Sequence, residues 1–449
     1  MFGSRIRSRA WTRAVVLCAL AVIGSSIASA APSADTAAPA TEATTREQQQ
    51  QRAYNASHPY LNDEFSPGEG SESGIDELED VGRPETPILD TEGFDGPLSW
   101  VRGKFDALHA RTGLRLGVAY TALGMAANGA NDPNGAAHDL DLMSAWTLVG
   151  RDTPNTGVLV TTAEYRDEIG DDPAASVGPR LGTLINTVNT FNDRQWVVRD
   201  AYWLQRLYDD KLRILAGRAD ISDYVGQQPM QNVNVLFANR AFSANPTVPF
   251  PGHGPMIGVS VRPTDRFYVT GGIANGYNNT TRYEINTIDD GDFYYATEAG
   301  WTPTIEGMGT GRYSIMVWHL DARSQNGFVS PSDEGVTLVA GQQLTNRLQV
   351  WARYAHADAK TTNIREIVQA GMGYGGLFGS PSNMSGFAAS YAEPRSNVSR
   401  EEKVIELFHR LQVSRFTQFS VGAQMVFDPG NNTDEDHVEV IYVRLRLAL

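Results

Sequence analysis

Residues 403–449 decide the fold, because three segments within them alternate between apolar and polar side chains. They read ELFHRLQV over residues 406–413, QFSVGAQMVF over residues 418–427 and IYVRLRLAL over residues 441–449. Successive side chains of a β-strand point to opposite faces, so each segment predicts a strand with one apolar and one polar face. A soluble β-sandwich also alternates but rarely has such long strands, whereas a tilted strand needs roughly 9–11 residues to cross a membrane. The pattern therefore indicates a membrane β-barrel with its apolar face toward lipid and its polar face toward a wet lumen.

The same alternation recurs from about residue 113 to the end of the chain. It predicts sixteen strands, at approximately 113–124, 138–149, 157–167, 195–208, 211–219, 255–263, 266–274, 292–301, 312–322, 335–344, 347–357, 366–377, 384–393, 403–414, 417–427 and 438–449. The whole is an all-β, closed antiparallel transmembrane barrel, in which an even number of strands follows from closure.

The connections between these strands support a barrel. Alternate connections are short, such as 209–210, 263–265, 345–346 and 415–416, and most of the others are long and rich in Gly, Asn, Asp and Pro. Short turns at one end and long loops at the other are typical of an outer-membrane barrel with both termini in the periplasm. The turns around 302–311 and 378–383 are longer than this pattern predicts. The longest connection, 220–254, either folds into the lumen or stays on the surface.

The N-terminal part of the chain divides into two segments. Residues 1–30 are typical of a secretory signal peptide, because four arginines precede a short apolar run and Ala28-Ser29-Ala30 suits a signal peptidase. Residues 31–97 carry fifteen acidic residues against three arginines, which predicts a disordered or weakly helical periplasmic linker. This leader is either a spacer or a tether to the cell wall or to a partner protein. Residues 98–449 form the barrel domain, which begins with a short amphipathic helix that Gly113 ends.

Composition and motifs exclude several classes of function. The net charge is −15 and becomes −19 without the four signal arginines, which argues against a nucleic-acid partner. The single cysteine, Cys18, lies in the predicted signal, so the mature chain has no disulfide and no cysteine metal site. No later apolar run is long enough for a membrane-spanning helix. The chain has no motif of a zinc protease, a serine hydrolase or a P-loop nucleotidase, and we expect no enzyme activity, no cofactor and no metal site.

Charged residues of both signs recur on the polar faces of the predicted strands. They are Asp139, Asp141, Glu164, Arg166, Arg353, Glu406, Arg410, Arg444 and Arg446. Charges of both signs side by side offer many hydrogen-bond donors and acceptors, which suits neutral polyhydroxylated solutes, whereas rings of one sign select ions. Arg199 and Asp200 are adjacent in one predicted strand, so alternation alone does not say which of them faces the lumen.

Several short motifs resemble one known family. They are VTTAEYR at 160–166, AGRADISDY at 216–224, WHLD at 318–321, YAEP at 391–394, ELFHRLQ at 406–412 and DPG at 428–430. In this order they are similar to the carbohydrate-selective outer-membrane porins of the OprB family. The resemblance implies a sixteen-stranded barrel through which sugars diffuse past a constriction that contains Arg and Glu. By position it implies that Glu164, Arg166, Arg218, Asp220, Glu406 and Arg410 line that constriction, and the strand pattern adds Arg353. The chain ends in LRLAL, where such barrels usually end in an aromatic residue.

Three functions fit these observations. The first is a passive porin for mono- or oligosaccharides, and the second is a general or ion-selective porin without sugar specificity. The third is a structural outer-membrane barrel with a plugged lumen. All three place the barrel in outer-membrane lipid as a monomer or homotrimer, with the leader in the periplasm as a candidate for cell-wall contact.

Overall fold

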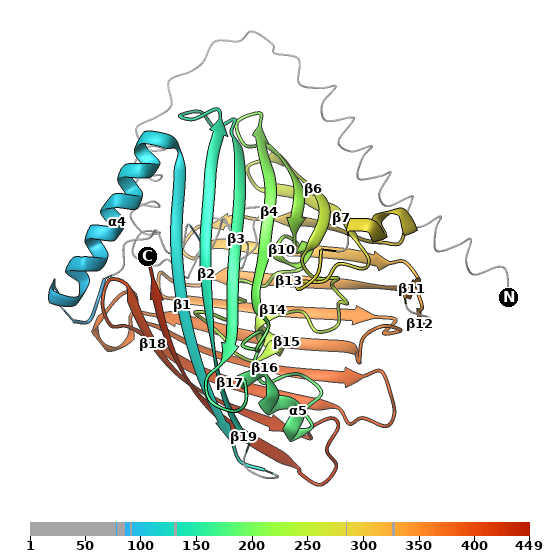
Figure 1. Ribbon diagram of the computed structural model, residues 1–449. Helices are drawn as coiled ribbons and strands as arrows, with labels where there is room; N and C mark the ends of the chain where they lie inside the picture. The colour runs from blue at the N-terminus through green and yellow to red at the C-terminus, as the bar shows by residue number, and fades with distance from the viewer. Residues whose placement is uncertain (1–77, 79–85, 90–91, 130–132, 284, 326–327) are drawn as a thin grey trace.

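Sixteen antiparallel strands close into a barrel, as the alternation predicts (Figure 1). The structure is a computed structural model that describes residue 78 and residues 86–89, 92–129, 133–283, 285–325 and 328–449. Each barrel strand pairs with the next one along the chain, and β1 pairs with β19 to close the ring, with Ala119 opposite Ala448. None of the helices in these residues combines the length and the hydropathy that a membrane crossing requires.

The barrel strands correspond one by one to the predicted ranges. They are β1 (Leu114–Ala127), β2 (Asn134–Val149), β3 (Gly157–Glu168), β4 (Gln195–Leu207), β5 (Leu212–Ala219), β6 (Gly254–Thr264), β7 (Phe267–Asn275), β8 (Phe293–Trp301), β10 (Gly309–Leu320), β13 (Asp333–Gln343), β14 (Leu348–Ala357), β15 (Ile364–Gly375), β16 (Met384–Pro394), β17 (Glu402–Gln412), β18 (Thr417–Phe427) and β19 (His437–Ala448). Among the described residues of the connections, three short strands occur, namely β9 (Thr304–Ile305), β11 (Arg323–Gln325) and β12 (Phe328–Ser330).

Alternation separates a lipid-facing surface from the lumen. On β19, Ile441 is 65% exposed and points outward, whereas Arg444 is 1% exposed and points into the barrel. On β2, Trp146 points outward, and Asp139 and Asp141 are buried inside. The hydrocarbon region contains no water to satisfy backbone groups, so a sheet spans it only when every strand has two partners. The closed ring meets that requirement and leaves the polar faces for the interior.

The connections are short at one end of the barrel and long at the other, as predicted. The two longer turns at the short-turn end contain local structure. In one, β9 pairs with the start of β10, and in the other, residues Leu377–Gly379 form a 3₁₀ turn. At the opposite end, β11 and β12 form a small hairpin in the connection between β10 and β13.

Helix α4 (Glu92–Thr112) precedes β1 and lies at the end with the short turns (Figure 1). Gly113 follows it with a φ of +76°, a left-handed conformation that glycine adopts at helix ends. Arg151, in the turn after β2, donates hydrogen bonds to the carbonyls of Ala110 (3.1 Å) and Arg111 (3.3 Å). The barrel thereby satisfies carbonyl groups that the end of a helix leaves unpaired. The helix begins earlier than predicted, so the expected domain boundary at residue 97 falls inside it.

The described part of the predicted linker lies against the barrel. The N–H groups of Ile88 and Leu89 donate to the carbonyls of Gln412 (2.9 Å) and Val413 (3.1 Å), beside the turn between β17 and β18. Leu78 is 1% exposed and belongs to a cluster of apolar side chains that face the lumen. The predicted signal peptide and the rest of the linker lie outside the described residues and stay predictions.

The connection between β5 and β6, residues 220–253, folds into the lumen, and we call it the inner loop. Most of its side chains are buried. Its Phe237 packs against Phe408 of β17 with ring centroids 4.9 Å apart, and both Phe237 and Phe242 contact Trp351 of β14. Helix α5 (Val177–Leu181), in the connection between β3 and β4, joins the same apolar cluster. Of the two placements considered for this connection, the inward one is therefore observed.

Single cysteines test which end of the barrel faces outward, because the predicted mature chain has no cysteine of its own. We expect Thr281→Cys, in the long connection after β7, to react with a membrane-impermeant maleimide on intact cells. Asp209→Cys and Asn346→Cys, in short turns, should react only after the cells are lysed. All three positions are exposed, so access across the membrane rather than burial decides the result. Labelling of Asp209→Cys on intact cells would reverse the orientation.

Candidate functional site

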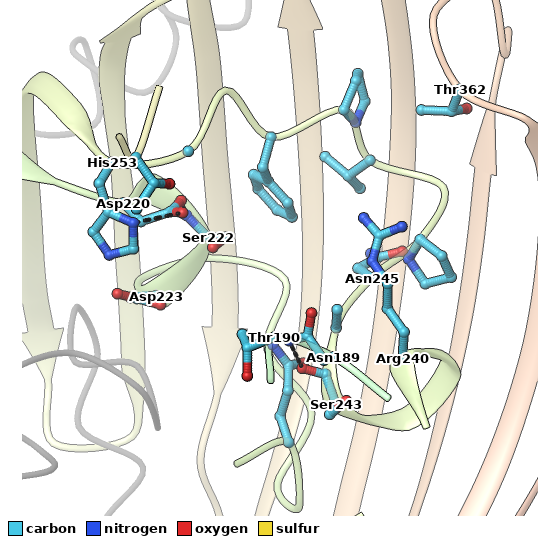
Figure 2. Close-up of a pocket in the computed structure, with 18 of the residues that line it drawn as sticks. Asn189, Thr190, Asp220, Ser222, Asp223, Arg240, Ser243, Asn245, His253 and Thr362 are labelled. Carbon is cyan, nitrogen blue, oxygen red and sulfur yellow. Dashed lines mark hydrogen bonds and ion pairs between the residues drawn. The ribbon is translucent and has the colours of Figure 1, made fainter. Parts of the chain in front are cut away.

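A cavity of about 480 Å³ lies between the inner loop and the lumen wall at β3 and β4. Figure 2 shows His253, Asp220 and Asp223 at one side of it and Arg240 and Asn245 at the other. The charged and titratable residues that line it are Arg166, Arg194, Arg199, Asp220, Asp223, Arg240 and His253. The predicted pore residues Arg166 and Asp220 are therefore on the cavity.

Glu164 is the centre of an ion-pair network in the wall of this cavity. Nε of Arg166 lies 2.7 Å from Oε1 of Glu164 and 3.1 Å from Oδ2 of Asp139. Arg194, just before β4, also donates to Glu164, and Nη1 of Arg199 lies 3.6 Å from its Oε2. Glu164 itself is fully buried behind these three guanidinium groups. The predicted neighbours Glu164 and Arg166 are thus brought together, in a larger cluster than alternation alone indicated.

A β-bulge adds Arg199 to this network. The pairing of β4 with β3 skips Arg199 between the partners of Thr162 and Ala163, so Arg199 is an extra residue in β4. Both Arg199 and Asp200 are therefore buried and face the lumen, although strict alternation would separate them. Nη1 of Arg199 lies 3.7 Å from Oδ1 of Asp141, and its Nε lies 3.1 Å from Oδ2 of Asp200.

The inner loop supplies the other charged wall of the cavity. The Asp220 carboxylate accepts a hydrogen bond from the N–H of Ser222 (2.9 Å) and caps a short 3₁₀ turn, Ile221–Asp223. Nδ1 of His253 lies 3.6 Å from Oδ2 of Asp220, and its Nε2 lies 3.8 Å from Oδ1 of Asp200. Burial, together with the positive charge of nearby arginines, lowers the pKa of His253 well below its ordinary value. The imidazole is therefore neutral at pH 7.

Glu406, on the opposite wall, binds the backbone of the inner loop. Its carboxylate accepts hydrogen bonds from the N–H groups of Ala238 (2.7 Å) and Asn239 (2.9 Å), and from the hydroxyl of Tyr442 (2.8 Å). The group is fully buried. The structure thus uses this predicted pore residue to hold the loop.

Two arginines bind carbonyl groups of the same loop. Arg353 of β14 donates to the carbonyl of Ala241 (3.0 Å) and to Oε1 of Gln231 (2.9 Å). Arg444 of β19 donates to the carbonyls of Val233 (2.5 Å) and Leu236 (2.8 Å). Both guanidinium groups are buried under the loop. Like Glu406, Arg353 is therefore not among the residues that line the cavity.

The remaining two predicted pore residues lie elsewhere. Arg410 of β17 is fully buried and donates to the carbonyl of Ser382 (3.0 Å), in the turn between β15 and β16. Arg218 of β5 donates to the carbonyls of Val198 (2.7 Å) and Thr280 (2.7 Å), and its guanidinium lies 4.7 Å from the ring centroid of Tyr283. Arg218 therefore ties the connection after β7 to the barrel and does not line the cavity.

The cavity residues that sequence reasoning missed lie in connections or at the bulge. Arg194, Arg240 and His253 are outside strands, where no alternation says which way a side chain points. The one available signal was the length of the connection 220–254, which indicated a functional loop without selecting residues in it.

Comparison with known proteins identifies the family. A model of the carbohydrate-selective porins of the OprB family matches residues 147–449, about two thirds of the chain. The chain belongs to this family. OprB-family membership and the barrel fold together place the protein in the outer membrane.

Individual relatives of this OprB-family chain are distant. It is 21% identical over 283 residues to porin AaxA of Chlamydia trachomatis serovar D, covering 62% of this chain and 60% of the relative. The chain thus matches about 60% of the length of these curated relatives. The high-pH structure of Pseudomonas putida OprB superimposes with a TM-score of 0.66 at 17% identity, over 78% of this chain and 97% of that one. At this sequence identity, the similarity of the two structures shows a shared barrel fold and nothing further.

Replacing Glu406 tests whether the wall holds the inner loop. Glu406→Ala removes the acceptor of two buried N–H groups, and each unsatisfied group costs roughly 1–3 kcal/mol. The loop should then leave the wall for part of the time, and we expect a larger and noisier single-channel conductance in planar bilayers. Glu306→Ala, which removes an exposed charge in the turn between β8 and β10, is the matched control. Identical conductance traces for folded Glu406→Ala and wild-type protein would contradict this role.

Proposed function

We propose that this OprB-family porin lets small carbohydrates diffuse passively across the outer membrane through the charged cavity. The observation that carries this proposal is the balance of the network around Glu164. Arg166, Arg194 and Arg199 supply three positive charges, and Asp139, Asp141 and Glu164 supply three negative ones. These charges cancel at a distance, whereas the guanidinium groups of Arg166, Arg194 and Arg199 line the cavity as donors. Asp220 and Asp223 supply carboxylate acceptors on the same cavity.

Sugar hydroxyl groups suit such a surface. Each hydroxyl both donates and accepts hydrogen bonds, so it can exchange its water partners for guanidinium and carboxylate groups in turn. A neutral solute gains nothing from a net field, and a balanced wall offers it contacts without attracting a competing ion. The inner loop, held by Glu406, Arg353 and Arg444, narrows the lumen beside this wall and supports a limit on solute size.

A cation-preferring general porin is the second candidate function. Asp200, Asp220 and Asp223 add negative charge around the cavity beyond the balanced network. Unbalanced carboxylates along a pore attract cations.

For both candidate functions, we propose the same orientation in the membrane. The long loops face the exterior, and the short turns and the leader face the periplasm.

Replacing Arg166 separates the two functions. Arg166→Ala removes donors to Glu164 and Asp139 and leaves an excess negative charge in the wall. For a sugar porin, we expect a shift of the reversal potential toward cation selectivity and weaker sugar binding, by about 1–3 kcal/mol for a lost hydrogen-bonding partner. The measurements are reversal potential in planar bilayers and liposome swelling in glucose or maltose. Arg266→Ala, in the exposed turn between β6 and β7, makes the same change in net charge outside the cavity.

The outcomes distinguish three cases. A changed ion preference with unchanged swelling would support the general porin. No change in either measurement would remove Arg166 from the permeation path. A change of the same size in Arg266→Ala would attribute the effect to net charge alone.

A further inference from the structure

One group of side chains at the edge of the cavity is not explained by sugar passage. Asp200 comes from β4, Asp223 from the 3₁₀ turn of the inner loop and His253 from the residue before β6. Each offers one oxygen or nitrogen atom, and these three atoms all lie within 4.8 Å of one another. The three residues are far apart in the sequence, so they do not form a recognisable metal-binding motif.

His253 has the surroundings of a ligand rather than those of a hydrogen-bonded core histidine. Neither ring nitrogen has a hydrogen-bond partner among the described residues, although the ring is mostly buried. Nε2 faces Asp200 at 3.8 Å and Nδ1 faces Asp220 at 3.6 Å, both longer than a hydrogen bond. Two ligand atoms across a tetrahedral zinc ion lie about 3.4 Å apart, so small side-chain movements would bring Asp200 and Nε2 to coordination distance.

Asp220 lies next to the second ring nitrogen of His253, the one that faces away from Asp200. Metal-bound histidines usually direct their second nitrogen to a carboxylate, which fixes the tautomer and the orientation of the ring. Nδ1 of His253 points to Asp220, and Asp220 is itself fixed by the N–H of Ser222 (Figure 2). This leaves Nε2 to face Asp200.

The arginines near this group belong to the wall network. Arg199, with its Nε 3.1 Å from Oδ2 of Asp200, also lies near Asp141 and Glu164, so its charge is shared among three carboxylates. Arg166 and Arg194 contact Glu164 on the neighbouring part of the wall. A cation at this place would therefore be held by its ligand atoms rather than by a net negative charge.

We propose that Asp200, Asp223 and Nε2 of His253 bind a divalent transition-metal ion, represented by Zn²⁺, with Asp220 positioning the histidine. A ligand set of imidazole nitrogen and carboxylate oxygen suits zinc, whereas Ca²⁺ and Mg²⁺ prefer oxygen ligands alone. The effect of this ion on transport rests on the proposed function, because His253 lines the cavity assigned to solute passage. A bound ion would add positive charge there and oppose the passage of cations.

Zinc binding to the folded full-length porin in detergent tests the site directly. We expect calorimetric titration with ZnCl₂ to show one site per chain that a tenfold excess of Mg²⁺ does not occupy. His253→Ala and Asp223→Asn should each weaken binding by on the order of tenfold or more. His319→Ala is the matched control, since His319 lies 3.2 Å from Asp321 and also faces carboxylates, but away from this group. Retained resistance of the folded barrel to unfolding in detergent gels would show that each variant folds.

Two results would overturn the metal site. One is the absence of zinc binding to the wild-type porin, and the other is equal affinity in wild-type and His253→Ala protein. Conductance in planar bilayers with micromolar Zn²⁺ then tests the location. Zinc should reduce the cation current of the wild type and not that of His253→Ala. If zinc binding depends on His253 but the current does not change, the metal site is supported. The same result would contradict the proposal that solutes pass through this cavity.

Discussion

Hydrogen bonds from charged wall residues to the backbone of the inner loop are the interaction on which the interior depends. A loop buried in a barrel exposes N–H and C=O groups that neither sheet nor water satisfies, and each group left unpaired would be costly. Glu406 accepts from two N–H groups, and Arg444 and Arg353 donate to carbonyls. Glu402 does the same for the connection between β3 and β4, where it accepts from the N–H of Ile185. Both inward-folded segments are thereby fixed.

This requirement divides the charges of the lumen into two populations. Arg353, Glu406 and Arg444, on β14, β17 and β19, are covered by the loop and bind its backbone. The charges on β2, β3 and β4 pair mainly with one another and lie beside the cavity. The same residue types on the same barrel face therefore have different roles, according to whether the loop lies over them.

The barrel was predictable from sequence, whereas the division of its charges was not. Alternation places Glu164 and Arg166 on the lumen face, because side-chain direction along a regular strand follows from local geometry alone. The bulge at Arg199 breaks that regularity, and only the pairing with β3 reveals it. The tasks of Glu406 and Arg353 depend on contacts with a loop more than one hundred residues away along the chain. Position on a strand carries no information about such contacts.

The pairing of β1 with β19 joins the two most distant strands of the ring. The strand pairing at this seam connects residues that are over three hundred positions apart in the sequence. Beside it, the side chain of Arg446 donates a hydrogen bond to the hydroxyl of Thr121 (2.9 Å) across a similar separation. Every other barrel strand pairs with its neighbours along the chain, so a sheet built in this order keeps two open edges until β19 pairs with β1. Such edges pair readily with other chains, and the entropy of joining distant segments makes closure slow. Closure of this barrel therefore requires its final strand, and the open edges are places where another chain can pair until that strand is added.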